Sequence, residues 1–141
     1  MSGYLLDTNV LSEVVKKRPK PSVLARLRQV APGSVFTSVV CVTELRYGAR
    51  RRPGGEVLWE RIAREVLGRV RVLPIREGEA LRAGDLLADL EAAGLPIGIE
   101  DILIGATALV GSLTVATRNV RHFRRLPGLL VESWWPEENR S

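Results

Sequence analysis

The stretch Tyr4-Leu5-Leu6-Asp7-Thr8-Asn9-Val10-Leu11 (residues 4–11) decides how this chain is expected to fold. A short apolar run ends at the charged residue Asp7, and Thr8 or Asn9 can cap the helix that we predict from Val10 to about Lys17. A strand that is apolar on both faces is typical of a sheet with helices on both sides. The stretch therefore predicts a buried strand with a carboxylate at its end.

The same alternation of strand and helix continues along the chain. We predict further strands at residues 35–37, 70–73, 113–116 and 129–131, and further helices at residues 23–30, 39–49, 57–67, 77–93 and 100–110. Strands that alternate with helices indicate a mostly parallel sheet. The predicted fold is an α/β/α sandwich of three layers around a central five-stranded sheet.

Length and composition set limits on the kind of protein. The chain has 141 residues, which suits one domain spanning residues 1–141, with a polar tail from about residue 133. Cys41 is the only cysteine and His122 the only histidine, which excludes a disulfide scaffold and a structural zinc site of the Cys/His kind. The longest uncharged run, residues 102–117, is too short for a membrane span. We expect a cytoplasmic protein that does not contact membranes.

The charge of the chain points to an anionic partner. Lysine and arginine number 21 against 16 acidic residues, and the formal net charge is +5. Only Lys16, Lys17 and Lys20 are lysines, so arginine supplies most of the positive charge. Arginine suits phosphate recognition, which favours nucleic acid or an acidic protein as the partner. A surface that simply uses arginine in place of lysine explains the composition equally well.

Four polar residues lie where parallel sheets form their sites. Asp7 and Asn119 follow predicted strands, Glu44 lies early in the helix after a strand, and Asp101 begins a helix. Each has an ordinary explanation on its own, as a turn, cap or solvated residue. Together they predict a carboxylate cluster, which a hard cation such as Mg²⁺ or Mn²⁺ would neutralise. With a basic surround, such a site indicates phosphodiester hydrolysis.

Four segments that cover nearly the whole chain in order resemble the motifs of PIN-domain ribonucleases. They are Leu5-Leu6-Asp7-Thr8-Asn9-Val10-Leu11, Thr43-Glu44-Leu45-Arg46-Tyr47-Gly48, Asp101-Ile102-Leu103-Ile104-Gly105-Ala106-Thr107-Ala108 and Ala116-Thr117-Arg118-Asn119-Val120-Arg121-His122-Phe123. Within that family, the short single-domain form is similar to the VapC toxins of toxin–antitoxin pairs. The resemblance implies a PIN-like fold and a metal-dependent endoribonuclease.

The resemblance assigns roles to individual residues. It implies that Asp7, Glu44 and Asp101 hold Mg²⁺ or Mn²⁺ and that a metal-activated water attacks the RNA phosphate, leaving a 5′-phosphate. Asn119 matches a catalytic position where many members carry a fourth acid, which puts a second ion in doubt. The supporting residues implied are Thr8, Asn9 and Thr117. His122 falls where the family has variable residues.

The resemblance also implies a homodimer and a cognate VapB-type antitoxin that covers the acidic pocket. The candidate contacts to RNA or antitoxin are Arg46, Arg50, Arg51, Arg52, Arg118 and Arg121. One alternative is a PIN domain that has lost activity and only binds RNA or protein. Phosphatases and receiver domains with an aspartate near the first strand need a later lysine, and no lysine follows Lys20.

Overall fold

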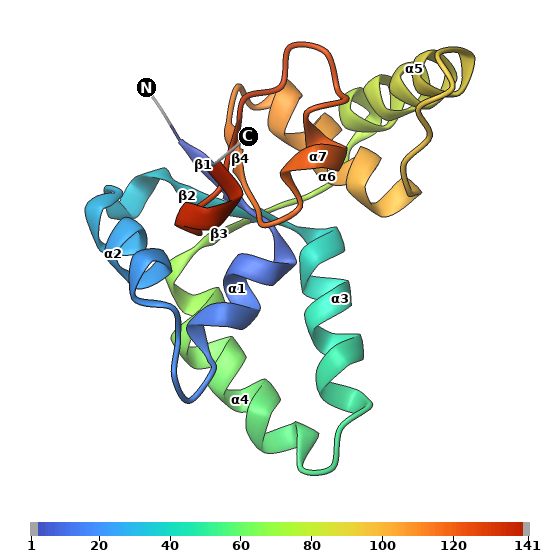
Figure 1. Cartoon of the computed structure of the whole chain (residues 1–141). Coiled ribbons are helices and arrows are strands. Elements are labelled where there is room, and N and C mark those ends of the chain that lie inside the picture. The colour runs from blue at the N-terminus through green and yellow to red at the C-terminus, as the bar shows by residue number, and fades with distance from the viewer. Residues whose placement is uncertain (1–2, 140–141) are drawn as a thin grey trace.

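The computed structural model of the chain describes residues 3–139 (Figure 1). At its centre is a five-stranded sheet in the order β3-β2-β1-β4-β5, in which every neighbouring pair of strands is parallel. The strands are β1 (Tyr4–Leu6), β2 (Val35–Ser38), β3 (Arg71–Leu73), β4 (Thr114–Ala116) and β5 (Val131–Glu132). The predicted five-stranded parallel sheet is confirmed.

Within the described residues, seven α-helices surround the strands: α1 (Thr8–Val14), α2 (Pro21–Gln29), α3 (Val39–Arg50), α4 (Gly55–Glu65), α5 (Glu77–Ala92), α6 (Ile99–Val110) and α7 (Val120–Phe123). Figure 1 shows α5, α6 and α7 on one side of the strands and α1, α2 and α4 on the other. Helix α3 contacts α1 and α4 but also α6. The arrangement is the PIN-like α/β/α fold that the sequence predicted.

Local sequence signals explain where several helices begin and end. The Ser38 hydroxyl caps α3, because it accepts a hydrogen bond of 3.0 Å from Val40 N. Gly94 follows α5 with φ of +70°, a conformation that glycine adopts without strain. The segment after Asn119 was expected to be a turn, and its middle forms the short helix α7.

The core is centred on β1 and reaches to the end of the chain. Leu5 and Leu6 are at most 1% exposed, and they belong to one apolar cluster with Trp134 and Trp135, which are 2% exposed. The two tryptophans lie inside the segment that was expected to be a polar tail. Arg26 in α2 helps to fasten this segment, because its guanidinium pairs with Glu132 and lies over the Trp134 ring.

Candidate active site

Asp7, Glu44 and Asp101 line one cleft at the carboxyl ends of β1 and β4, where parallel sheets place their sites. Asp7 follows β1 directly, and its backbone N donates a hydrogen bond of 2.9 Å to the Ala116 carbonyl of β4. A cleft of about 430 Å³ opens at this edge of the sheet. Its lining residues are Asp7, Thr8, Asn9, Ser12, Glu13, Lys16, Glu44, Asp101, Arg118, Asn119 and Trp135.

Asp7 is the buried centre of the cleft, with 5% of its surface exposed. Its Oδ1 accepts a hydrogen bond of 2.8 Å from Thr8 N, and its Oδ2 accepts one of 2.7 Å from Thr117 Oγ1. The pKa of Asp7 is raised to about 6, mainly by burial; the hydrogen bonds from Thr117 and Thr8 lower it, and the charges of Asp101 and Glu44 add to the rise. Within residues 3–139, this buried carboxylate forms no ion pair with a lysine or arginine.

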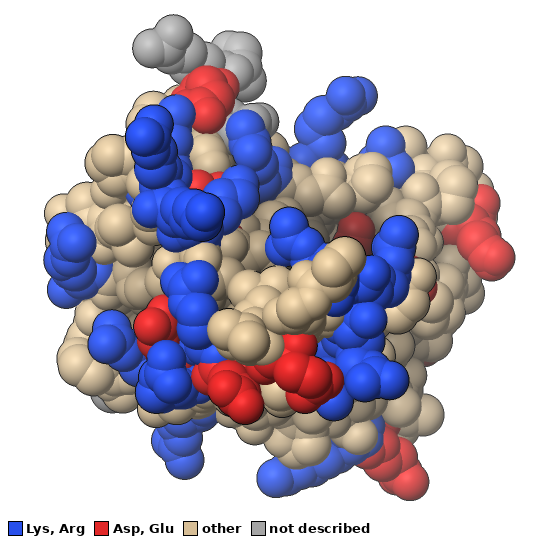
Figure 2. All heavy atoms as spheres, turned by 90° about the horizontal axis from the view of Figure 1, so that it is seen from below, with Lys and Arg blue, Asp and Glu red and all other residues tan. Residues whose placement is uncertain are grey.

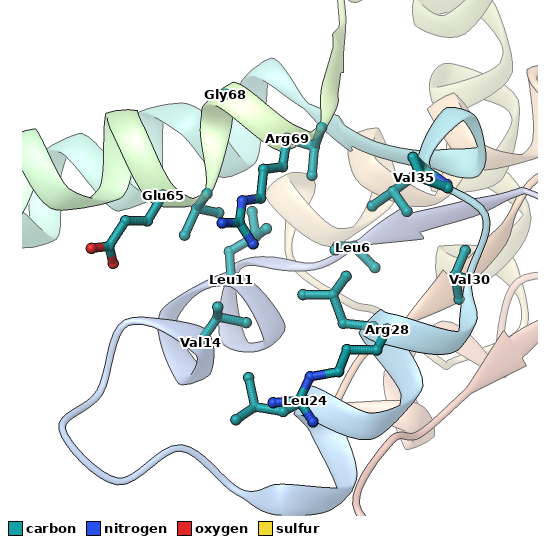
Figure 3. Close-up of a pocket in the computed structure, with 14 residues that line it drawn as sticks. Leu6, Leu11, Val14, Leu24, Arg28, Val30, Val35, Glu65, Gly68 and Arg69 are labelled. Carbon is teal, nitrogen blue, oxygen red and sulfur yellow. The ribbon is translucent and has the colours of Figure 1, made fainter.

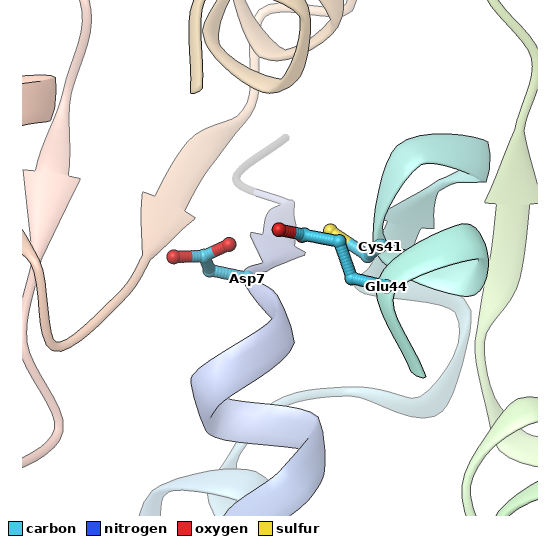
Figure 4. Close-up of side chains that lie close together, drawn as sticks. All are labelled: Asp7, Cys41 and Glu44. Carbon is cyan, nitrogen blue, oxygen red and sulfur yellow. The ribbon is translucent and has the colours of Figure 1, made fainter. Parts of the chain in front are cut away.

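Glu44 reaches the cleft from α3, where its carboxylate extends toward Asp7 (Figure 4). Thr8 Oγ1 donates a hydrogen bond of 2.5 Å to Glu44 Oε1, so the residue next to Asp7 holds the second acid in place. Thr8 thus links the end of β1 to α3.

The Cys41 thiol lies behind these two acids. Its sulfur and one carboxylate oxygen each from Asp7 and Glu44 lie within 4.8 Å of one another (Figure 4). Burial, with the nearby Asp7 charge, raises the pKa of Cys41 to about 11, so the thiol stays protonated. It faces the Leu6 carbonyl oxygen at 3.8 Å. Cys41 therefore serves as a small buried side chain, and the carboxylate oxygens are the atoms of this cluster that suit a hard cation.

Asp101 faces the cleft from the first turn of α6, and two side chains adjoin it. Asn119 Nδ2 lies 3.4 Å from Asp101 Oδ2 and 2.9 Å from His122 Nδ1. His122 Nδ1 itself lies 3.4 Å from Asp101 Oδ2. His122 was assigned to a variable position from the sequence alone. Its contact with Asp101 depends on the short helix α7, which the sequence did not reveal.

Asn9 and Thr117 form a polar layer beneath the acids. Asn9 Nδ2 donates a hydrogen bond of 3.2 Å to Asp7 Oδ2, and Asn9 Oδ1 accepts one of 3.1 Å from Arg118 N. Thr117 Oγ1 also accepts a hydrogen bond of 2.9 Å from Asn119 N. Asn9 and Thr117 therefore connect Asp7, at the end of β1, to the segment that follows β4.

The candidate arginines separate into groups. Arg118 lines the cleft and lies over the Trp135 ring at 5.3 Å. Arg46 and Arg50 both pair with Glu56, at 3.6 and 3.5 Å. Arg121 is exposed and does not line the cleft. The sequence reasoning did not single out Ser12, Glu13, Lys16 or Trp135 as residues of the cleft, because their place depends on how α1 and the chain end pack.

Comparison with known proteins agrees with this geometry. The family model of the PIN domain matches residues 4–129. The chain is 35% identical to ribonuclease VapC2 of Haemophilus influenzae over 136 residues, which cover 95% of this chain and 99% of that protein. It is 36% identical to toxin FitB of Neisseria gonorrhoeae over 135 residues, or 92% and 97% of the two chains.

A solved structure is also similar to this chain over nearly its full length. The crystal structure of FitAcB from Neisseria gonorrhoeae superposes with a TM-score of 0.87 at 34% identity and covers 94% of this chain and 99% of that one. The chain belongs to the PIN domain family. Within that family, its similarity over nearly full length places it with the VapC-type members.

Proposed function

We propose that this protein is a VapC-like endoribonuclease, a toxin that hydrolyses RNA phosphodiester bonds and is inhibited by a cognate antitoxin. The observation that carries the proposal is the convergence of Asp7, Glu44 and Asp101 on one cleft at the carboxyl ends of β1 and β4. The ribonuclease name of a relative that matches nearly the full length supports the same conclusion. We further propose that the chain forms a single PIN domain over residues 1–141.

The three carboxylates suit Mg²⁺ or Mn²⁺, which prefer oxygen ligands. The raised pKa of Asp7 fits this assignment, because a buried carboxylate beside two other acids lacks a compensating charge that a divalent cation would provide. Asp7, Glu44 and Asp101 would hold the ion. When bound, the ion would supply a lowered pKa for an attacking water and charge neutralisation on the phosphate.

The remaining residues of the cleft would orient these groups. Thr117 and Thr8 donate to Asp7 and Glu44, and such outer hydrogen bonds fix the direction of metal-binding carboxylates. Asn119 offers a neutral amide where a fourth acid would add charge, which favours one firmly held ion over two. We propose that Arg118, which lines the cleft, contacts an RNA phosphate.

The antitoxin proposal rests on the resemblance to VapC toxins and on the relative named toxin FitB. Besides covering the acidic cleft, such a partner has a second surface available. An apolar groove of about 600 Å³ lies between α1, α2 and the end of α4. Figure 3 shows Leu6, Leu11 and Leu24 around this hollow, with Arg28 and Arg69 beside it. This combination suits the apolar face of a helix that carries acidic residues at its edges.

We also propose a homodimer. Large apolar side chains remain exposed on β3, α5 and α6: Val72 is 40% exposed, Leu81 65% and Val110 48%. Exposed apolar surface of this kind is typical of a contact between proteins. Sedimentation of the purified chain measures its oligomeric state directly. Leu81→Glu should shift a dimer toward monomer.

The alternative function is a PIN domain that binds RNA or protein without cleaving it. Metal binding separates the two functions. Calorimetric titration of the purified chain with Mn²⁺ should show binding that Asp101→Asn weakens about tenfold or more, because a ligand carboxylate is lost. Equal titration curves for the wild type and Asp101→Asn would contradict the proposed metal site and favour the binding-only domain.

A further inference from the structure

A second hollow continues directly from the acidic cleft. It encloses about 700 Å³ between the end of α1 and the helix pair α3–α4, and it shares Ser12, Lys16 and Glu44 with the cleft. We call this hollow the basic groove. Its cationic lining residues are Lys16, Lys17, Arg51, Arg52 and Arg61. A flexible chain bound at the acids can therefore run on into the groove.

The groove carries an excess of positive charge, although Lys16 pairs with Glu13 and Arg61 with Glu65 at 3.7 Å. Among its lining residues, Glu44 is the only carboxylate, and that side chain belongs to the cleft. Figure 2 shows the face below α1, α3 and α4, where blue lysine and arginine side chains predominate around a smaller acidic patch. A concave surface with one sign of charge concentrates ligands of the opposite sign. The groove thus favours a polyanion.

The cations of the groove have two different roles. Lys16 Nζ pairs with Glu13 at 2.9 Å, and Arg61 Nη2 donates a hydrogen bond of 3.1 Å to the Val15 carbonyl. These contacts fix the walls of the groove. Lys17 and Arg52 are exposed, and within residues 3–139 neither forms an ion pair. Their charges can meet a ligand without breaking an existing contact.

The arginine run 50–52 is divided by the end of α3. Arg51 and Arg52 line the groove, and the Arg51 guanidinium lies 5.2 Å from the centre of the Tyr47 ring. Arg50 instead pairs with Glu56 and does not line the groove. Three consecutive arginines that look equivalent in the sequence therefore have different surroundings.

We propose that the basic groove binds the single-stranded RNA segment next to the cleaved phosphate, with Lys17, Arg51 and Arg52 contacting its backbone phosphates. This inference rests on the proposed ribonuclease function. RNA is favoured over an acidic protein segment because the groove continues from the cleft in which the proposed ribonuclease function places the cleaved phosphate. The apolar floor of Val15, Leu45, Leu58 and Ile62 suits ribose and base faces without selecting a sequence.

The test compares two variants that each lose two positive charges. Lys17→Gln/Arg52→Gln changes the groove, and Arg82→Gln/Arg124→Gln changes exposed arginines outside it. Fluorescence anisotropy would follow binding of a labelled uridine homopolymer of about 12 nucleotides in EDTA, which prevents cleavage. For single strands, each phosphate contact contributes about 0.7 to the slope of log affinity against log salt. Thermal melting would confirm that both variants fold.

The groove variant should reduce the salt slope by about 1.4 and weaken binding severalfold, while the control variant keeps the wild-type slope. Equal slopes for the two variants would overturn the proposed RNA path. The proposal would also be overturned if binding of a polyglutamate peptide required Lys17 and Arg52 while binding of RNA did not. That result would favour an acidic protein partner. Wild-type cleavage with metal, measured in parallel, shows whether the ribonuclease function holds when the groove assignment fails.

Discussion

Thr117 Oγ1 donates a hydrogen bond of 2.7 Å to Asp7 Oδ2, which joins residues 110 positions apart in the chain. The bond spans the ends of the adjacent strands β1 and β4. It also connects the buried carboxylate to the loop that carries Asn119, because Thr117 Oγ1 accepts from Asn119 N. One hydroxyl thereby sets the positions of two residues of the proposed active site.

Thr117→Val should weaken Mn²⁺ binding by about tenfold or more, because the hydroxyl that orients Asp7 is removed. It should also lower the free energy of unfolding by about 1–3 kcal/mol, since buried polar groups lose a partner. Thr107→Val is the matched control, because Thr107 is also buried but donates within α6 to the Leu103 carbonyl. Equal metal affinity in the two variants would assign Thr117 a structural role only.

Asp7→Asn should stabilise the metal-free protein at pH 8. The pKa of Asp7 is about 6 in the folded protein against 3.8 for an ordinary aspartate, so the folded state binds the proton more tightly than the unfolded state. The proton on Asp7 therefore adds roughly 3 kcal/mol to the free energy of unfolding below pH 4, and this contribution is lost as the pH rises through 6. The variant should therefore melt several degrees higher at pH 8, with little difference at pH 4.

Two controls complete this test. Asp85→Asn changes an exposed aspartate of α5 and should leave the pH dependence of melting unchanged. Mg²⁺ should raise the melting temperature of the wild type but not that of Asp7→Asn, because binding to the folded state stabilises it. If the melting temperature of Asp7→Asn declined between pH 4 and 6 as that of the wild type does, a group other than Asp7 would be the source of the decline.

Asn119→Asp should create a stronger site for a second divalent ion. The amide now donates toward Asp101 and His122, and an aspartate in its place would add an oxygen ligand and a negative charge. Titration with Mn²⁺ should show a second ion bound about tenfold more tightly than by the wild type. Superimposable titration curves would show that position 119 does not limit the number of ions.

Gly55→Ala should destabilise the fold, because a Cβ atom there would lie 1.7 Å from the Ala49 carbonyl oxygen. This contact marks the close approach of α3 and α4 that forms one wall of the basic groove. We expect a loss of about 2–3 kcal/mol in thermal or urea unfolding. Gly84→Ala in α5 meets no atom within 4 Å and should instead add about 0.5–1 kcal/mol. Similar effects for both substitutions would contradict the packing at Gly55.

The fold was predictable from the sequence because its signals are local. Ser38 caps α3 as expected, and the apolar run before Asp7 forms the central strand. The tryptophans at 134 and 135 were misjudged as part of a polar tail because their neighbours are charged or proline. Their burial depends on Arg26 of α2 and on the sheet edge, which no local pattern shows.

The proposed acids were also foreseeable, since the carboxyl ends of parallel strands meet at one edge. The surroundings of the site were not. His122 reaches Asp101 because residues 120–123 form one turn of helix, and the pattern there indicated only a turn. Arg50 and Arg52 differ in their contacts because α3 ends between them, and helix ends are set by packing as much as by sequence.

The most direct test of the proposed enzyme is cleavage of total RNA by the purified, antitoxin-free protein, with Asp7→Asn in parallel. Reactions would contain Mg²⁺, Mn²⁺ or EDTA, and the products would be separated by electrophoresis. The account predicts discrete fragments that require the divalent ion and are absent with Asp7→Asn. Folded protein that leaves RNA intact with either ion, or fragments that persist with Asp7→Asn or in EDTA, would contradict it.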